Sequence, residues 1–237
     1  MKKIVIENLP ELPYYITEAL NQLRISLSFS GQDVKSIMVT SSMPNEGKSF
    51  IAMQLWKMIA EVGNRVVILD CDLRNSEMRS KLGFELDEEM PGIIHGISGQ
   101  AELEDVVYPT NIENGFLVPV EMTLSNPSNL LEGSRFSELL QMCREEFDYV
   151  IIDSPPVGAV ADALTIGPLT DGCLYVIWSG KSQRKLVENS IQLLKRADIP
   201  LLGVVLNRAD INRRRSYYYH QYYRYSYDYY GGKKRKR

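Results

Sequence analysis

The stretch SSMPNEGKS, Ser41 to Ser49, decides the fold of this 237-residue chain. An apolar, β-branched run, Ile37 to Thr40, leads into it, and a segment with helical spacing follows. The order of strand, loop and helix, with the triplet Gly-Lys-Ser at the end of the loop, is typical of a phosphate-binding loop. The usual pattern has glycine where this chain has Ser42, so the surrounding sequence has to support the motif.

Each part of the loop has an expected role toward a nucleotide. Backbone N–H groups near the start of the helix would cradle a polyphosphate, helped by the positive end of the helix. The Lys48 ammonium would reach the β- and γ-phosphates, and the Ser49 hydroxyl would hold Mg2+. We expect ATP to be bound by Ser42, Asn45, Glu46, Gly47, Lys48, Ser49, Phe50 and Asn207.

Outward from the loop, short apolar runs alternate with helical patterns. A helix is predicted over 50–62, ending at Gly63. Short strand-like runs lie at 65–69, 116–120, 149–153, 173–178 and 201–207, and several of them are continuously apolar, as in buried parallel strands. Helices are predicted at 134–146, 160–169 and 183–197. The sequence therefore predicts a doubly wound α/β fold of the phosphate-binding-loop type, with a mostly parallel sheet and helices on both faces.

Acidic residues follow two of these strands directly. Asp70 and Asp72 come after the strand at 65–69, and Asp153 ends the strand at 149–153. Ligands bind outside the carboxyl ends of parallel strands, so we expect these side chains to face the phosphates. Ser49, Asp72 and Asp153 are the expected magnesium ligands, because Mg2+ prefers carboxylate and hydroxyl oxygens. Lys48, Asp70 and Asp72 are the expected catalytic residues, with Asp70 free to act as base. The alternative is that these acids are solvated turn residues, as a single acid after a strand often is.

Composition excludes several classes of protein. The three cysteines form no C-x-x-C pair, which argues against a disulfide framework and a zinc site. Only two histidines are present, so His-rich metal catalysis is not expected. No apolar run approaches the ~20 residues of a membrane span, and the N-terminus lacks the apolar core of a signal peptide. We expect a cytoplasmic protein.

The charge is divided unevenly along the chain. Residues 213–237 hold nine Lys or Arg and one acid, a net charge of +8, whereas residues 1–212 hold 18 basic and 29 acidic residues, a net charge of −11. The segment 213–237 has no aliphatic residue and is predicted to be disordered. Its aromatic residues are all tyrosine, which favours phosphorylation over stacking on single-stranded nucleic acid. The expected phosphoacceptors are Tyr217, Tyr218, Tyr219, Tyr222, Tyr223, Tyr225, Tyr227, Tyr229 and Tyr230.

These motifs together resemble the bacterial tyrosine kinases, the autokinases of capsular and exopolysaccharide synthesis in Gram-positive bacteria. TSSMPNEGKS looks like their Walker A motif, VVILDCDLRNS like Walker A′ and YVIIDSPP like Walker B. NPSNLL, VADAL, VVLN and the terminal tyrosines also fit, so the resemblance covers essentially the whole chain.

The resemblance implies ATP- and Mg2+-dependent phosphorylation of the chain's own C-terminal tyrosines, in the regulation of polysaccharide synthesis and export. It implies a homo-oligomeric ring, a membrane-spanning activator whose cytosolic tail docks on the kinase and recruits it to the inner face of the membrane, and a protein-tyrosine phosphatase. No nucleic acid partner is expected. Within an E-x-x-R-x-x-R interface helix, Glu18 and Arg24 match, and Asn21 replaces the middle arginine. Phe50 stands where a second hydroxyl often follows the loop.

The expected organisation is an interface helix segment at 1–30, an ATP-binding kinase domain at 31–212 and the tail. The helix predicted at 14–29 would pack on the domain or be offered to a neighbouring subunit. Two other functions remain open: a positioning ATPase of the ParA or MinD type, and an ATP-binding scaffold without kinase activity. The first has a second lysine early in the loop, where this chain has Met43.

Overall fold

Strands and helices alternate along the chain around one sheet. The structure, a computed structural model, describes residues 2–31, 33–87 and 89–209. In this part of the chain the strands are β1 (Ser36–Ser41), β2 (Val66–Asp70), β3 (Tyr108–Pro109), β4 (Gly115–Val118), β5 (Tyr149–Asp153), β6 (Gly172–Trp178) and β7 (Leu201–Asn207). They form a seven-stranded sheet in the order β3-β4-β2-β5-β1-β6-β7, in which β3 alone is antiparallel to its neighbour. The predicted doubly wound, mostly parallel sheet is confirmed.

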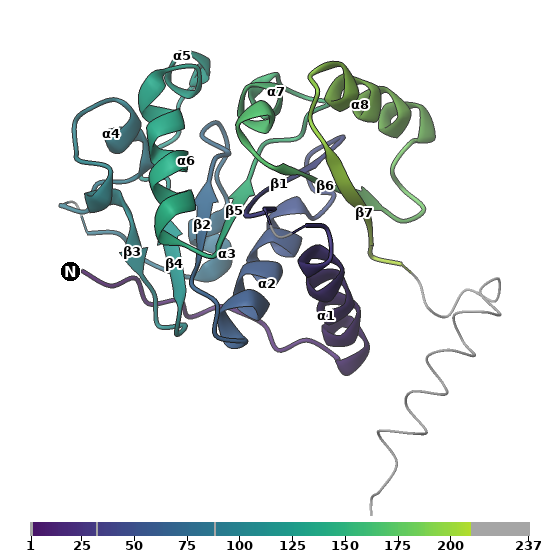
Figure 1. The fold of residues 1–237 in the computed structure, drawn as a ribbon, viewed down its shortest axis with the longest axis horizontal. Helices are drawn as coiled ribbons and strands as arrows, with labels where there is room; N and C mark the ends of the chain where they lie inside the picture. Colours follow the sequence, from purple (N-terminus) through teal and green to yellow (C-terminus); the bar gives the residue numbers. More distant parts are fainter. Residues whose placement is uncertain (1, 32, 88, 210–237) are drawn as a thin grey trace, which may run out of the picture.

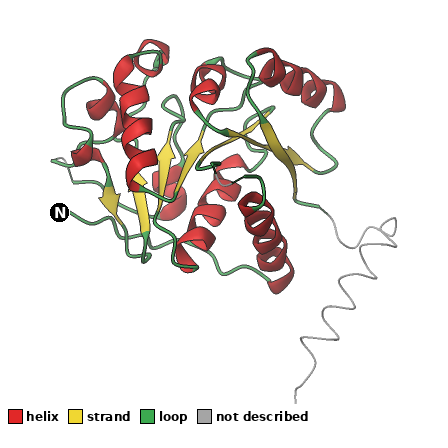
Figure 2. Cartoon of the chain, in the orientation of Figure 1, coloured by secondary structure: helices red, strands yellow, loops and turns green. Residues whose placement is uncertain are grey.

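Helices cover both faces of this sheet, as Figures 1 and 2 show. One face carries α1 (Tyr14–Ser28), α2 (Lys48–Glu61) and α3 (Met78–Leu82). The other carries α4 (Ile93–Ile97), α5 (Ser128–Leu131), α6 (Ser134–Glu146), α7 (Asp162–Ile166) and α8 (Arg184–Arg196). Short 3-10 turns lie at Glu104–Val106 and Gly167–Leu169.

Alternation within the strands divides the core into two layers. In β1, Met38 packs against the layer under α6 and α7, whereas Ile37 and Val39 pack against the layer under α1 and α2. Every residue of β1 and β2 is buried, because a parallel sheet covered on both faces has no solvent side. Leu20 and Leu27 of α1 are buried in the layer that holds α2, so this helix packs on the domain.

The sheet order differs in one respect from the simple strand-helix-strand unit expected around the loop. β5 lies between β1 and β2 and pairs with both of them. Asp70 and Asp153 are direct partners in the β2–β5 register. The ends of the three strands that carry the loop and the acids therefore meet at one edge of the sheet.

Two predicted elements are shorter than expected, and proline is the reason in both. β4 ends at Val118, because Pro119 has no N–H for the ladder. The helix expected at 160–169 is α7 followed by a 3-10 turn that contains Pro168. The helices α3, α4 and α5 and the two-residue β3 were not predicted. The expected disordered tail, 213–237, lies outside the described residues.

No helix in the described ranges is long and apolar enough to cross a lipid bilayer.

Candidate ATP and magnesium site

A cleft of about 1350 Å³ opens at the carboxyl ends of the strands, between the phosphate-binding loop, α1, the loop after β2 and the end of β7. Most of the residues predicted to bind ATP or Mg2+ line it: Asn45, Gly47, Lys48, Ser49, Phe50, Asp72, Asp153 and Asn207. Three of the predicted residues, Ser42, Glu46 and Asp70, are not among the residues that line the cleft.

Gly47 is required where the loop enters α2. Its φ angle is 100°, and a β-carbon there would lie 1.9 Å from Nδ2 of Asn207. That amide donates to the Glu46 carbonyl at 3.0 Å, so the end of β7 holds the loop in place. The first turn of α2 consequently presents its N–H groups to the cleft, as an anion site requires.

Ser42 explains why this loop tolerates the loss of the usual glycine. Ser42 is 1% exposed, and its hydroxyl forms a hydrogen bond with the hydroxyl of Tyr175, a buried residue of β6. On the other side, a β-carbon at Gly158 would lie 2.3 Å from the Ser42 carbonyl oxygen. The side chain of Ser42 therefore anchors the loop to the core and points away from the predicted nucleotide.

Glu46 has a similar anchoring contact. Its carboxylate accepts from the Met43 N–H at 2.9 Å and from the Ser182 hydroxyl. Ser182 in turn accepts from the N–H of Trp178 at 2.9 Å. The carboxylate thus holds the loop's shape, and only the backbone of Glu46 is available for the predicted phosphate contact.

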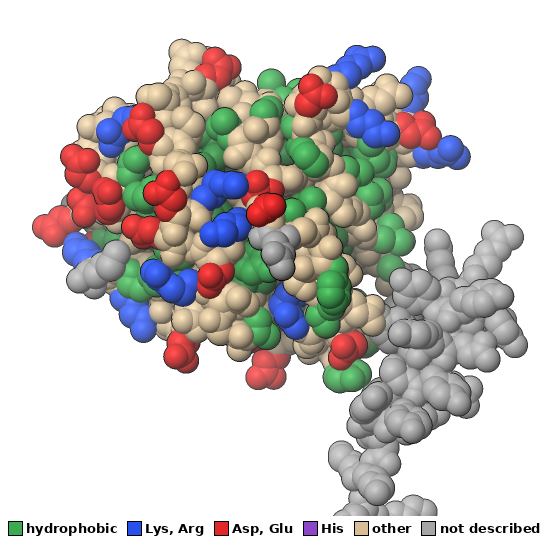
Figure 3. Space-filling view, viewed as in Figure 1, with side chains coloured by type: hydrophobic (Ala, Val, Ile, Leu, Met, Phe, Trp, Pro, Cys, Tyr) green, Lys and Arg blue, Asp and Glu red, His purple; other side chains and the backbone are tan. Residues whose placement is uncertain are grey.

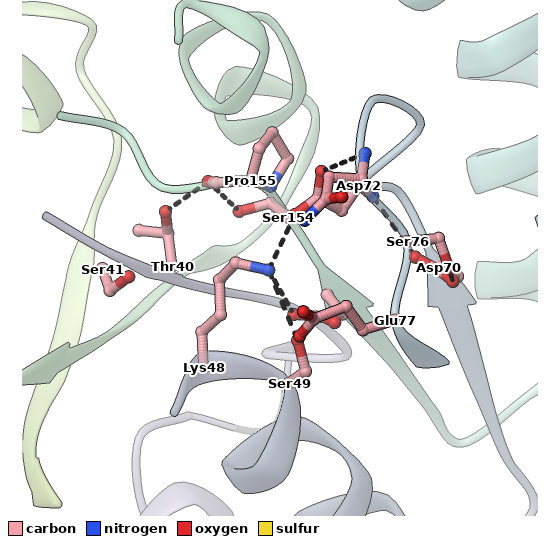
Figure 4. A network of polar contacts seen from close by, with 12 residues as sticks. Thr40, Ser41, Lys48, Ser49, Asp70, Asp72, Ser76, Glu77, Ser154 and Pro155 are labelled. Carbon is pink, nitrogen blue, oxygen red and sulfur yellow. Dashed lines mark hydrogen bonds and ion pairs between the residues drawn. The ribbon is translucent and has the colours of Figure 1, made fainter. Parts of the chain in front are cut away.

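Lys48 lies at the centre of the acidic group (Figure 4). Its Nζ is 3.0 Å from Oδ2 of Asp72, 3.6 Å from Oδ1 of Asp153 and 3.3 Å from the Ser49 hydroxyl. Burial acts to lower the pKa of Lys48, but attraction to Asp153 and Asp72 outweighs it and raises the pKa. The lysine is therefore charged and shared between two carboxylates.

Asp153 has an incompletely satisfied carboxylate. Oδ1 is buried and has no hydrogen-bond partner among the described residues; it forms an ion pair with Lys48 at 3.6 Å. Burial raises the pKa of Asp153 despite this lysine. The hard oxygen donors of Ser49, Asp72 and Asp153 fit Mg2+, which usually takes one or two protein carboxylates and completes its shell with water and phosphate oxygens. No cluster of three or more Asp, Glu, His or Cys residues in the described ranges is placed to hold a metal.

Asp70 lies behind this group. It is 2% exposed, and its carboxylate accepts from the Ser76 hydroxyl and, at 3.3 Å, from the Asp72 N–H. Burial, followed by repulsion from Asp153, raises the pKa of Asp70 to about 7. The protonation of this acid thus changes near neutral pH, as a general base requires, although its carboxylate does not line the cleft.

Sequence reasoning missed four charged residues near the acids. Arg74, Glu77 and Lys81 line the cleft, and Lys81 pairs with Glu77 at 2.7 Å. Arg74 pairs with Asp162 at 2.6 Å. Arg74 and Asp162 lie within the motifs DCDLRNS and VADAL, so the sequence held a signal for them but not for their pairing.

The predicted interface residues lie on α1. The Glu18 residue is half-buried, and Nε of Arg24 is buried without a hydrogen-bond partner in the described part of the chain. All nine predicted phosphoacceptor tyrosines lie outside the described residues.

Comparison with known proteins places this geometry in a family. An AAA domain family matches residues 34–177. Tyrosine-protein kinase CpsD of Streptococcus pneumoniae serotype 4 is 36% identical over 196 residues, covering 82% of this chain and 85% of its own length. CpsD of Streptococcus agalactiae is 32% identical over 193 residues, covering 81% and 83%. Tyrosine-protein kinase wzc of Salmonella typhimurium is 32% identical over 89% of this chain, but the match spans 29% of the Salmonella protein.

Solved structures agree. The kinase domain of Escherichia coli tyrosine kinase ETK superimposes with a TM-score of 0.78 at 27% identity, over 89% of this chain and 86% of that one. The cell-division protein MinD of Pyrococcus horikoshii, at 22% identity and a TM-score of 0.63, shares the fold alone. On the extent and identity of these matches, the chain belongs to the bacterial tyrosine kinases.

Proposed function

We propose that this protein-tyrosine kinase uses ATP and Mg2+ to phosphorylate tyrosines of its own C-terminal segment. The observation that carries the proposal is the placement of Lys48 between Asp72 and Asp153 in a cleft large enough for a nucleotide. Phosphoryl transfer depends on positioning and on neutralising charge at the γ-phosphate, and this cleft supplies a lysine, helix N–H groups and two carboxylates for that purpose.

Lys48 pairs with both carboxylates and would bind phosphate oxygens through the same ammonium. Ser49, Asp72 and Asp153 would hold Mg2+, which bridges phosphate oxygens and neutralises their developing charge. Asp70 is the group whose pKa suits it to accept the tyrosine proton. To reach an acceptor hydroxyl, its carboxylate has to leave Ser76.

The predicted acceptor tyrosines follow the site closely in the sequence. β7 ends at Asn207, which lines the cleft, and the first tyrosine of the tail is ten residues further along the chain. A short flexible tether gives an effective concentration of about millimolar. The tail carries +8 and the rest −11, and Figure 3 shows acidic side chains gathered over the region of β3 and α4. Unphosphorylated tails are thus attracted to the kinase body. Each phosphate adds a charge of about −1.5 to −2, so modifying all nine tyrosines would move the tail from +8 to roughly −6 to −10 and turn the attraction into repulsion.

The proposal includes partners. A ring of copies would place one tail near a neighbour's cleft, with Glu18 and Arg24 at the interface. A membrane-spanning activator would dock through its cytosolic tail and recruit the kinase to the inner face of the membrane, and a phosphatase would reverse the reaction. The match to only 29% of the Salmonella protein supports the activator, since there the kinase-like segment is part of a much longer chain. The processes served would be capsular and extracellular polysaccharide synthesis and export.

The ParA or MinD alternative is less well supported. Met43 stands where that family has its second lysine, and the side chain is partly exposed at the loop. The other alternative is a scaffold that binds ATP without transferring its phosphoryl group, and an activity measurement distinguishes it from a kinase.

The test is incubation of the full, phosphatase-treated chain with labelled ATP and Mg2+, followed by phosphotyrosine detection. A variant with all nine tail tyrosines changed to phenylalanine is the matched control. The proposal requires label on tyrosine in the wild type and its loss in the variant. ATP hydrolysis without phosphotyrosine would indicate a positioning ATPase, binding without turnover a scaffold, and label retained in the nine-fold variant an acceptor elsewhere.

A further inference from the structure

The Arg74 guanidinium, two residues after Asp72, binds two other segments of the chain. Its Nε and Nη2 donate to the two carboxylate oxygens of Asp162 at 2.6 and 3.0 Å, a paired geometry that lysine cannot form. Its Nη1 donates to the Ser125 carbonyl at 2.7 Å, and Nη2 also lies 3.2 Å from the Ser128 hydroxyl. These contacts join the loop after β2 to the start of α5 and to α7.

The acid in this contact is more deeply buried than the base. The Asp162 side chain is 1% exposed and that of Arg74 is 28% exposed. Asp162 also accepts from the Ser128 hydroxyl at 3.1 Å, so both of its oxygens are hydrogen-bonded. A buried carboxylate is stable only with such partners, and the geometry of Arg74 is therefore tightly determined.

The position of this contact connects it to the acidic group. Arg74 belongs to the loop that carries Asp72, and Asp162 begins the helix that follows the loop after Asp153. β2 and β5 are neighbours in the sheet. The Arg74–Asp162 pair thus links the two loops, two residues after Asp72 and nine residues after Asp153.

We propose that Arg74 is a positioning residue, which uses Asp162 to fix the separation of Asp72 and Asp153 and thereby sets the affinity of the cleft for a divalent cation. The inference rests on the proposed function, which assigns these two carboxylates to Mg2+. Residues that orient metal ligands typically change metal affinity by 10- to 100-fold when they are altered. Because Arg74 also lines the cleft, the test has to separate positioning from direct contact with nucleotide.

The experiment measures binding of Mn2+, as a probe for the divalent site, by the electron paramagnetic resonance signal of the free ion. The full chain is used with saturating ADP, so that no phosphoryl transfer occurs. Arg74→Lys keeps the charge and removes the paired contact; Asp162→Asn changes the other partner, which does not line the cleft. Arg184→Lys, at an exposed arginine of α8 that pairs with Glu188, is the matched control.

Both single variants are expected to weaken Mn2+ binding by about 10- to 100-fold. The double variant should bind Mn2+ no more weakly than the single variant with the larger loss, because the two residues act as a unit. Wild-type Mn2+ affinity in Arg74→Lys, or effects that multiply in the double variant, would overturn the proposal. So would a loss of ADP affinity measured in EDTA in Arg74→Lys alone, which would show direct nucleotide contact.

Folding and function are controlled separately. Thermal unfolding identifies a variant that does not fold. If Asp162→Asn does not fold, it is replaced by Ser128→Ala, which removes one hydroxyl of the same contact and is expected to weaken Mn2+ binding by several-fold. Wild-type Mn2+ affinity in Ser128→Ala would count against the proposal. A wild-type chain that binds Mn2+ but makes no phosphotyrosine would refute the proposed kinase reaction. The role of Arg74 would still be decided by the Mn2+ affinities of the variants.

Discussion

Two buried ion-pair groups lie within the same edge of the sheet, and they differ in how well their charges are satisfied. Lys48 is shared between Asp72 and Asp153 at 3.0 and 3.6 Å, and Oδ1 of Asp153 has no hydrogen bond from the described residues. Arg74 and Asp162 form two short bonds, and both oxygens of Asp162 are paired. The difference teaches that the charged groups expected to bind a ligand keep an unfilled hydrogen-bonding position, whereas the charged groups that only connect segments have all their carboxylate oxygens hydrogen-bonded. We call the Arg74–Asp162 pair the saturated group.

The largest effect is expected at the loosely held lysine. Lys48→Met removes the ammonium that neutralises phosphate, so phosphotyrosine formation should fall by about 10^3-fold or more. The measurement is the initial rate of labelling from ATP. Lys57→Met, at a lysine of the same helix paired with Glu61, is the control and should label normally. Equal rates in the two variants would remove Lys48 from the mechanism.

Asp70→Asn is expected to lower the rate by about 10^2- to 10^4-fold, because a general base is lost. The wild-type rate should rise with pH through about 7, since Asp70 must be deprotonated to accept a proton and its pKa is raised to about 7. Rates measured between pH 5.5 and 8.5 test this. If the variant retains the same rise with the same midpoint, another group controls the reaction.

Substitution in the saturated group, the Arg74–Asp162 pair, should affect the stability of the fold more than the phosphoryl-transfer step itself. Asp162→Ala leaves the Arg74 guanidinium without its two strongest bonds, and the free energy of unfolding should fall by about 3 kcal/mol, the lower end for a buried pair because Arg74 keeps some access to water. Urea unfolding measures this. Glu188→Ala breaks an exposed pair on α8 and should leave the free energy of unfolding nearly unchanged. Similar losses in the two variants would contradict the contrast between saturated and exposed pairs.

Asp70 should also cost stability at high pH. Its folded pKa of about 7 lies above the ordinary value of 3.8, so the folded state binds more protons between these values and stability falls as pH rises from about 4 to 7. Asp70→Asn removes that cost, and should raise the free energy of unfolding by roughly 3 kcal/mol more at pH 8 than at pH 5. Urea unfolding at both pH values is the measurement, with Asp87→Asn, at an exposed acid, as the control. A gain independent of pH would show that Asp70 does not titrate in this range.

Local sequence determined the main elements and the chemistry of the site. The apolar runs predicted β1, β2, β5, β6 and β7 closely. For β1, β2 and β5 the reason is that buried parallel strands need no polar positions, whereas β7, at the edge of the sheet, has no buried residue. The Gly-Lys-Ser triplet and the acids after two strands predicted which edge of the sheet holds the site. Each of these signals lies within a few residues of the element it describes.

The tertiary structure decided what those residues contact. It turned the Ser42 hydroxyl toward Tyr175, 133 positions away, and paired Arg74 with Asp162 at a separation of 88. It inserted β5 between β1 and β2 and set Asp70 against Asp153, so that burial, followed by repulsion from Asp153, raises the pKa of Asp70. Such contacts follow from strand order and close packing across distant segments, which no local pattern of apolar and polar residues encodes.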